Sequence, residues 1–264
     1  MSPRVVAIIQ ARMSSSRLPG KVLLDITGKP MLMRVVTRTS RAKTVDQVLV
    51  ATTTDASDVP VAACCDSMNV SFTRGSLNDV LDRYYQTASQ AKADVVVRIT
   101  ADCPVIDPDL IDDCVNTLLE GPYDFTCNRL PPPFRRTFPI GLDTEVCTFS
   151  ALKNAWKESN ETFHREHVMP YLYEGVELKA ASDQLSEGIS PRGYKITQLH
   201  HDPDYGQMRW TVDTPEDLEF MRQLYSRFNG RDDFTWKDVL ALVQSEPELA
   251  AINSAVQHKT LYDK

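Results

Sequence analysis

The feature of this chain that most constrains its fold is a regular alternation of short β-rich runs with stretches of helical periodicity. Between most of the runs, apolar residues recur at helical spacing, as in 30–41, 77–91 and 107–119. Such alternation is typical of an α/β fold in which helices flank a mainly parallel, twisted sheet. The runs that predict strands are Val5–Ile9, Gln47–Thr53, Val70–Thr73, Asp94–Ile99, Tyr123–Cys127, Thr144–Phe149 and Arg209–Val212.

Capping residues mark the starts of two helices. Asp107 is a favoured N-cap residue and is followed by Pro108 at the first helical position. Thr214-Pro215-Glu216-Asp217 resembles a capping box before a second amphipathic stretch. The prolines of 131–139 exclude a helix or a central strand there and predict an irregular loop.

The chain has 264 residues, enough for one large or two small domains. We assign one domain to residues 1–230. After Gly230 the sequence changes to two amphipathic helical stretches. We therefore expect residues 231–264 to be a C-terminal helical extension that packs on the domain or on a second subunit.

Composition excludes several classes of protein. The net charge of −7 argues against a general nucleic-acid or anionic-membrane binder. No apolar run approaches the length of a membrane span. The 6 cysteines contain no C-x-x-C pair, so neither a zinc site nor a disulfide framework is expected. Reduced cysteines of this kind predict a cytoplasmic protein.

A basic loop directly follows the first predicted strand. It reads QARMSSSRLPGK, residues 10–21, and lies where open α/β sheets bind their ligands. Its serines allow close approach of the backbone to a phosphate, and Arg12, Arg17 and Lys21 supply positive charge. The loop is not a Walker A motif, because Val22 follows Gly20-Lys21, and G-x-G-x-x-G is absent. From the residues alone it is either a different phosphate loop or a solvated basic turn.

Two aspartates follow other predicted strands. Asp102 comes after DVVVRI and Asp213 comes after RWTV. Each alone is equally well explained as a cap or turn residue. Together with the basic loop they favour a nucleotide site, because two carboxylates and the phosphates of a substrate are the hard oxygen ligands that Mg²⁺ needs.

The segment ARMSSSRLPGKVLLDITGKPML resembles the N-terminal signature of the cytidylyltransferase family, which activates acidic sugars as CMP conjugates. Within it, the chain is most similar to the branch of spore-coat polysaccharide biosynthesis proteins. The similarity continues in order through nearly the whole chain, in VLVATTTDASD, RGSLNDVLDRYYQ, VVRITADCPVIDP, FPIGLDTEV, REHVMPY and RWTVDTPEDLE. Ser14 and Ala101 stand where many members of the family carry glycine.

The resemblance implies a Rossmann-like nucleotide-diphospho-sugar transferase fold and a role for each matching residue. Arg12, Arg17 and Lys21 would hold the triphosphate of CTP, and Ser15 would lie close to it. Asp102 and Asp213 would bind Mg²⁺, and Lys21, Arg12 and Asp102 would be the catalytic residues. Three residues of RGSLNDVLDR would border the base and ribose, although two of them could instead form an i,i+4 surface pair. These three are Arg74, Asp79 and Arg83.

The same resemblance implies an acceptor site and a reaction. Glu145, Arg165, Glu166 and His167 fall where the acceptor sugar is expected. The implied reaction transfers CMP from CTP to a sugar or sugar acid with release of pyrophosphate, for surface polysaccharide biosynthesis. Related enzymes suggest a homodimer. His164 and His167 lie three residues apart, but HREH is not H-E-x-x-H, so zinc is not expected.

Three alternatives stay open at this point. One is a nucleotidyltransferase that uses another nucleoside triphosphate and a sugar 1-phosphate. A second is a metal-dependent glycosyltransferase with a D-x-D motif, which Asp107–Asp109 and Asp202–Asp204 match literally. A third is a non-catalytic protein that binds nucleotides.

Overall fold

The structure is a computed structural model and describes residues 2–258. Its strands are β1 (Val5–Gln10), β2 (Asp25–Ile26), β3 (Lys29–Pro30), β4 (Gln47–Thr53), β5 (Phe72–Gly75), β6 (Val95–Thr100), β7 (Phe125–Cys127), β8 (Glu145–Thr148), β9 (Lys179–Ser182), β10 (Leu185–Ile189) and β11 (Lys195–Leu199). Its helices are α1 (Met31–Thr39), α2 (Val59–Ser67), α3 (Val80–Gln90), α4 (Pro108–Glu120), α5 (Phe149–Glu158), α6 (Thr162–His167), α7 (Pro170–Tyr173), α8 (Pro215–Arg227), α9 (Trp236–Ser245) and α10 (Pro247–Ala251).

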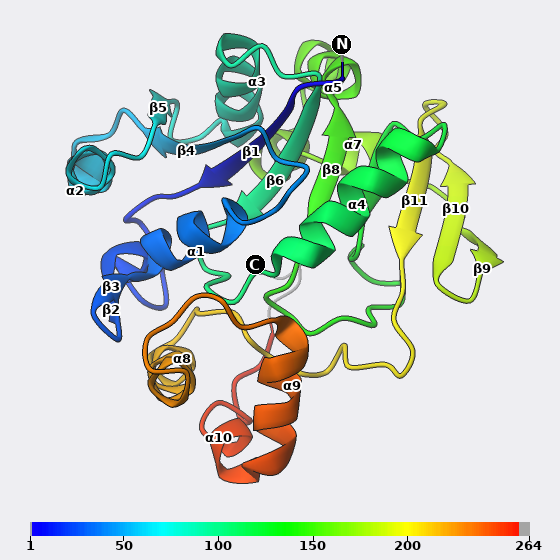
Figure 1. Cartoon of the computed structure of the whole chain (residues 1–264). Helices are drawn as coiled ribbons and strands as arrows, with labels where there is room; N and C mark the ends of the chain where they lie inside the picture. Colours follow the sequence, from blue (N-terminus) through cyan, green and yellow to red (C-terminus); the bar gives the residue numbers. More distant parts are fainter. Residues whose placement is uncertain (1, 259–264) are drawn as a thin grey trace.

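A nine-stranded sheet forms the centre of the molecule (Figure 1), with the strand order β5-β4-β1-β6-β8-β7-β11-β10-β9. Strands β5, β4, β1 and β6 run parallel to one another, so their carboxyl ends share one edge of the sheet. Strand β8 runs antiparallel to both β6 and β7, and the β9–β10–β11 meander ends the sheet. The predicted α/β architecture is confirmed, with its parallel part in the first half of the chain.

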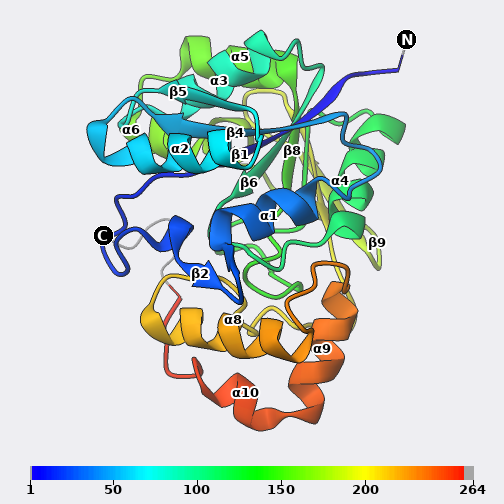
Figure 2. The same cartoon turned by 60° about the vertical axis from the view of Figure 1, so that its left-hand side comes forward.

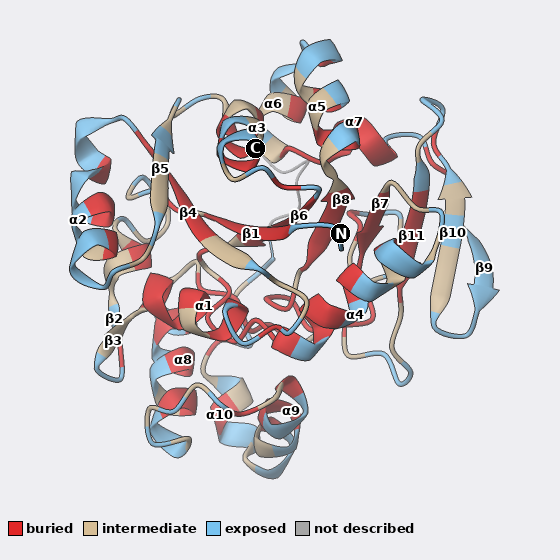
Figure 3. Ribbon diagram, turned by 45° about the horizontal axis from the view of Figure 1, so that its top comes forward, coloured by how far each residue is buried: buried red, intermediate tan, exposed pale blue. Residues whose placement is uncertain are grey.

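The alternation of side chains along β1 explains why helices cover both faces of the sheet. Val5, Ala7 and Ile9 belong to a core that includes side chains of α1, α4 and α8. Val6 and Ile8 belong to a second core with α3 and α5. Because a strand buried on both faces is apolar at every position, VVAII is a continuous apolar run. Figure 3 shows the central strands β1, β6 and β8 as mostly buried, β10 as mostly intermediate and β9 as exposed.

Two predicted strands need correction. Val70–Thr73 is displaced along the chain to β5, Phe72–Gly75, because the N–H of Val70 instead bonds to the Cys65 carbonyl at 2.9 Å and closes the end of α2. Arg209–Val212 is not a strand. It is an extended segment with a single bridge from Arg209 to Ile140, and its apolar residues Trp210 and Val212 are buried in the core.

Strands β9, β10 and β11 are missing from the sequence prediction. All four residues of β9 are exposed, and β10 is only partly buried. A strand with so little burial lacks the apolar alternation on which the prediction depends. The other predicted features hold: Asp107 caps α4, Thr214 and Asp217 form a capping box at α8, and 131–139 is irregular.

The C-terminal helices pack against the α/β domain, and Figure 2 shows α8, α9 and α10 grouped beyond one end of the sheet. Arg34 of α1 donates to the Gly230 carbonyl at 2.6 Å, and Arg38 donates to the Phe234 carbonyl at 3.0 Å. Side chains of α9 share the core of α1. The domain boundary at residue 230 stays a prediction, and residues 259–264 of the predicted extension lie outside the described residues.

Two further observations concern the class of protein. The six cysteines are unpaired, as predicted. Within residues 2–258, no helix combines the length and the apolar character needed to cross a membrane.

Candidate active site

A cleft of about 640 Å³ opens at the carboxyl ends of β1 and β6. It is bordered by the loop after β1, by the residues that follow β6 and by Asp213. The structure thus brings Lys21 into contact with Asp213, which lies 192 positions later in the chain. The residues predicted for the triphosphate and the metal that line this cleft are Arg12, Ser15, Arg17, Lys21, Asp102 and Asp213.

The basic loop is held at both ends by the body of the domain. The N–H of Met13 donates to the Asp58 carboxylate at 2.6 Å, and this buried carboxylate also accepts from the hydroxyl of Thr53 in β4. The N–H of Gly20 donates to the Met13 carbonyl at 2.9 Å and closes the loop. Gly20 has a φ of +72°, which a residue with a Cβ atom adopts only with strain. The serines between these anchors are left to face the cleft.

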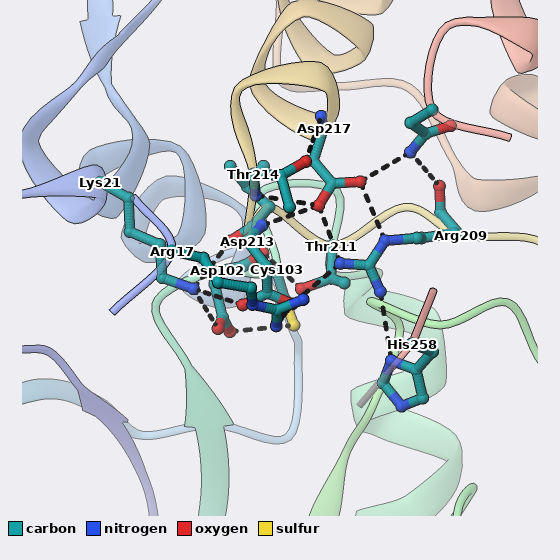
Figure 4. Close-up of polar contacts among 12 residues, drawn as sticks. Arg17, Lys21, Asp102, Cys103, Arg209, Thr211, Asp213, Thr214, Asp217 and His258 are labelled. Atoms are coloured by element: carbon teal, nitrogen blue, oxygen red, sulfur yellow. Dashed lines mark hydrogen bonds and ion pairs between the residues drawn. The ribbon is translucent and has the colours of Figure 1, made fainter. Parts of the chain in front are cut away.

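Lys21 lies at the centre of the site. Its Nζ is 2.8 Å from Asp102 Oδ2, 2.8 Å from Asp213 Oδ1 and 2.7 Å from the Val212 carbonyl (Figure 4). Burial alone would lower the pKa of this ammonium, but the two carboxylates outweigh burial and raise it above its usual value. The Lys21 ammonium in turn holds the pKa of Asp102 below its usual range, against the opposing effect of burial. All three groups are therefore charged at neutral pH.

The two oxygens of Asp213 have different partners. Oδ1 faces Lys21, whereas Oδ2 accepts from Arg17 and from Arg209, each at 2.9 Å. Figure 4 shows Lys21 and Arg17 on one side of Asp213 and Arg209 on the other. Burial raises the pKa of Asp213, but the surrounding cations, Lys21 first, lower it further than burial raises it.

The site fits a hard divalent cation. A positive charge already lies between two carboxylate oxygens, at 2.8 Å from each, and carboxylates are the ligands that Mg²⁺ takes together with substrate phosphates. In the part of the chain that the structure describes, no three His, Cys, Asp or Glu side chains form a group that could hold a metal ion. Phosphate oxygens and water would therefore have to supply most of the ligands.

A second, smaller cavity of about 180 Å³ adjoins the cleft and shares Gln10 and Arg12 with it. Besides Arg12, three predicted site residues line it, Arg83 for the base and ribose and Glu166 and His167 for the acceptor. The remaining lining residues are Ala11, Val80 and Arg98. Burial lowers the pKa of His167, so its imidazole is neutral at pH 7.

The small cavity contains buried polar atoms that have no partner among residues 2–258. They are Gln10 Oε1, Arg83 Nε and Arg98 Nε. Since buried polar groups are normally hydrogen-bonded, these three unpartnered atoms are exceptions among the residues beside the cavity. Two of the three belong to guanidinium groups, which favour an anionic ligand.

Four predicted residues lie in contacts that hold the protein together rather than in the lining described above. Arg74 donates to the Thr53 carbonyl at 2.8 Å. Asp79 caps α3 and pairs with Arg165 of α6, which approaches it at 3.0 Å through Nε, instead of forming the surface pair with Arg83. Glu145 is buried on β8 and forms an ion pair with Arg98.

The segments that match D-x-D also have structural roles. Asp107 is fully buried, caps α4 and accepts from the N–H of Trp236 at 2.6 Å. Asp204 pairs with Arg135 at 3.0 Å and accepts from the N–H of Gly206. These contacts do not favour a glycosyltransferase.

The prediction from sequence missed three residues that shape the site. Asp58 anchors the basic loop, Arg98 lines the small cavity, and Arg209 holds Asp213. Arg209 had a local signal, because it precedes Asp213 by four residues. Asp58 and Arg98 had none, since only the parallel arrangement of β4, β1 and β6 brings them close to the loop.

Comparison with known proteins places this α/β fold and its charged cleft in a class of nucleotidyltransferases. A sequence profile described as cytidylyltransferase matches residues 6–243. A solved structure titled as that of a cytidylyltransferase from Leptospira borgpetersenii is similar over 97% of this chain and 100% of its own, with a TM-score of 0.84 and 30% identity. The chain belongs to the cytidylyltransferase family and is an enzyme of that class.

Two relatives carry more specific names. The 3-deoxy-manno-octulosonate cytidylyltransferase of Polynucleobacter necessarius is 30% identical over 256 residues, which are 86% of this chain and 97% of the relative. The spore coat polysaccharide biosynthesis protein SpsF of Bacillus subtilis is 28% identical over 256 residues, which are 95% and 98% of the two chains. The resemblance noted in the sequence is thus confirmed.

Proposed function

We propose that this enzyme transfers CMP from CTP to a hydroxyl of a sugar acid and releases pyrophosphate, for the synthesis of a surface polysaccharide. The observation that carries the proposal is the convergence of three basic side chains and two carboxylates on one cleft at the carboxyl ends of β1 and β6. The family and the names of two relatives support the nucleotide, the acidic acceptor and the polysaccharide.

In this proposal the acceptor hydroxyl forms a bond to the α-phosphorus of CTP. The bond from that phosphorus to the oxygen that bridges to the β-phosphate breaks, and pyrophosphate leaves with the electron pair. The hydroxyl proton passes to solvent. Since phosphoryl-type transfer depends mainly on positioning and charge neutralisation, the chain need supply no nucleophile of its own.

Each residue of the cleft has a role in this reaction. Arg12, Arg17 and Lys21 bind the triphosphate and offset the charge that develops on the leaving pyrophosphate. Ser15 lets the loop backbone approach the phosphates. Lys21 can contact both the carboxylates and the phosphates, because its ammonium touches Asp102 and Asp213 and lines the same cleft.

Asp102 and Asp213 would hold Mg²⁺, which neutralises phosphate charge when it is bound. Their charged oxygens face one position, which the Lys21 ammonium fills in this structure, so Lys21 would turn to the phosphates when the metal binds. The carboxylates would fix that position relative to the basic loop, so that the triphosphate is held in one orientation.

The small cavity would receive the acceptor and part of the nucleoside of CTP, next to the triphosphate in the cleft. His167 and Glu166 would contact the acceptor, and the guanidinium of Arg83, which lines the same cavity, suits a carboxylate. Arg83 would also border the nucleoside, because the small cavity that it lines adjoins the cleft proposed for the triphosphate. Arg74, Asp79, Glu145 and Arg165 would support this region through the contacts described above. A homodimer in the cytoplasm stays part of the proposal.

The experiment that tests the proposal is a pyrophosphate-release assay. CTP, UTP, GTP, ATP and dTTP are each offered with a panel of sugar acids and sugar 1-phosphates, with and without Mg²⁺. Release that needs CTP, Mg²⁺ and a sugar acid is expected. Release with another triphosphate and a sugar 1-phosphate would contradict the substrate assignment, and release in the absence of divalent cations would contradict the metal site.

A further inference from the structure

Arg209 is a buried guanidinium that lies behind Asp213, and its side chain is only 6% exposed. Its Nη2 donates to Asp213 Oδ2 at 2.9 Å and to Asp217 Oδ2 at 2.8 Å, while its Nε donates to Asp217 Oδ1 at 2.9 Å. One planar group therefore serves two carboxylates with fixed geometry. Asp213 lines the cleft, whereas Arg209 is not among the described residues that line it. Arg209 therefore acts on the cleft through Asp213.

Asp217 fixes the backbone of the same aspartate. Its buried carboxylate accepts from the N–H of Asp213 at 2.9 Å and from the N–H of Thr214 at 3.1 Å, at the start of α8. The backbone of Asp213 is held by Asp217 directly, and its side chain is held by Asp217 through Arg209. A different rotamer of Asp213 would break the bond to Arg209.

Arg17 and Arg209 differ in how firmly they hold Asp213. Arg17 belongs to the basic loop and its side chain is 30% exposed, so a triphosphate in the cleft can attract it. Arg209 is tethered by Asp217 and cannot follow. When Arg17 turns to phosphate, Arg209 still holds Oδ2 and keeps Oδ1 directed at the cation position.

The chain after α10 closes over the other side of Arg209. The amide of Asn253, which is 5% exposed, donates to the Arg209 carbonyl at 3.2 Å and to Asp217 Oδ1 at 2.9 Å. His258 Nδ1 is 3.2 Å from Arg209 Nη1 (Figure 4). His258 is exposed at the surface, and partial desolvation of its ring, together with the cationic Arg136 and Arg209, lowers its pKa, so at pH 7 its neutral ring can accept from Arg209.

We propose that Arg209 is a positioning residue that orients the carboxylate of Asp213 toward the metal, and that the C-terminal segment 253–258 holds Arg209 in place. The inference rests on the proposed function, in which Asp213 binds the cation. Under this proposal the C-terminal extension contributes to the geometry of the active site, a role that its amphipathic pattern in the sequence does not indicate.

The test is direct binding of Mn²⁺, as a spectroscopic substitute for Mg²⁺, to the full chain with CTP and without an acceptor. Electron paramagnetic resonance distinguishes Mn²⁺ held by the protein from free Mn²⁺ and from the Mn²⁺–CTP complex, whose spectrum is recorded without protein, and thermal melting is recorded in parallel. The variants are Arg209→Gln, Arg209→Lys and Asn253→Ala. The control is Arg227→Gln, the same substitution on α8, where Arg227 pairs with Glu246 and is 32% exposed.

We expect Arg209→Gln to weaken Mn²⁺ binding by about 10- to 100-fold, which is the usual effect of removing a group that orients a metal ligand. Arg209→Lys should recover part of this loss, because an ammonium keeps the charge but cannot serve both carboxylates with the same geometry. Asn253→Ala should weaken binding less than Arg209→Gln does, and Arg227→Gln should bind like the unaltered chain.

The outcomes separate this inference from the proposed function. If the unaltered chain binds no Mn²⁺ with CTP, both are overturned. If the unaltered chain binds Mn²⁺ and Arg209→Gln binds it equally well while melting earlier, Arg209 is structural only and the inference alone is overturned. Should Arg209→Gln not fold, Arg209→Lys decides in the same way, and unchanged binding in Asn253→Ala overturns the role of the C-terminal segment.

Discussion

The cleft around Lys21 and the region around the small cavity use charged residues in opposite ways. In the cleft, Lys21 and Arg17 pair with carboxylates while also lining the space that a ligand would fill. Around the small cavity, Glu145 pairs with Arg98 and Asp79 pairs with Arg165, and these pairs join strand to strand and helix to helix. Charges of the first kind can be exchanged for those of a substrate, whereas charges of the second kind fix the architecture.

This difference predicts that substitutions in the cleft reduce activity far more than they reduce stability. Around the small cavity, substitutions in the ion pairs should reduce stability first. The following predictions test the two sides of that contrast and, at Asp143, a charged pair outside both regions.

The largest effect is expected at Lys21. Lys21→Met should lower turnover by about 10²- to 10³-fold, the scale on which a preorganised charged contact to the reacting groups acts. Turnover of CTP and the melting temperature are measured together. Lys157→Met, on the exposed face of α5, is the matched control. Turnover within a factor of two of the unaltered chain would contradict the role of Lys21.

The next effect is expected at the buried pair of Arg98 and Glu145, whose side chains are 14% and 6% exposed. Arg98→Gln leaves a buried carboxylate unpaired and should lower the free energy of unfolding by about 3 kcal/mol. The double variant Arg98→Gln/Glu145→Gln should recover much of this loss, because no unpaired charge remains. Denaturant unfolding of the four chains of this cycle measures both quantities. A single variant as stable as the unaltered chain would show that the pair does not support the fold.

A pH effect is expected at Asp143, which accepts from Arg136 Nη2 at 2.9 Å. Burial raises the pKa of this carboxylate, but Arg136 outweighs burial and lowers the pKa to about 2. Protons then bind the unfolded chain more readily than the folded one, so the stabilisation is complete above about pH 4 and is lost as the pH falls toward 2. Asp143→Asn should remove that part of the acid dependence, up to about 2 kcal/mol. The free energy of unfolding of both chains, measured between pH 2 and 5, checks this prediction. The same pH dependence in Asp143→Asn and the unaltered chain would contradict it.

The smallest effect is expected at Arg165. Its pair with Asp79 is partly exposed, so Arg165→Gln should cost about 1 kcal/mol of stability or less. The KM for the acceptor should stay within about twofold, because Arg165 supports α6 rather than lining the cavity. A large rise in that KM with unchanged stability would instead place Arg165 in contact with the acceptor.

The same contrast explains how much of the site could be predicted from sequence. Arg12, Arg17 and Lys21 sit in one loop directly after a strand, and Asp102 follows the neighbouring strand, so parallel packing alone brings them together. The partner of Glu145 depends on the antiparallel register of β8 on β6, and that of Asp79 depends on where α6 docks. Neither is encoded within a short segment, and both pairings were missed.

The fold divides in a similar way. Strands β1, β4 and β6 are buried on both faces and produce clear apolar runs, so they were predicted closely. Strand β9 is exposed throughout and has no such pattern. Arg209–Val212 shows the opposite error, because burial of Trp210 and Val212 gives an extended segment the apolar alternation of a strand without a ladder partner.

The most direct test of the nucleotide cleft is thermal melting of the unaltered chain with CTP, UTP, GTP, ATP and dTTP, each with and without Mg²⁺. A ligand that binds only the folded state raises the melting temperature. We predict a rise that requires Mg²⁺, is largest for CTP and disappears in Asp102→Asn. No rise with any triphosphate, or the same rise in Asp102→Asn, would contradict the assignment of the cleft.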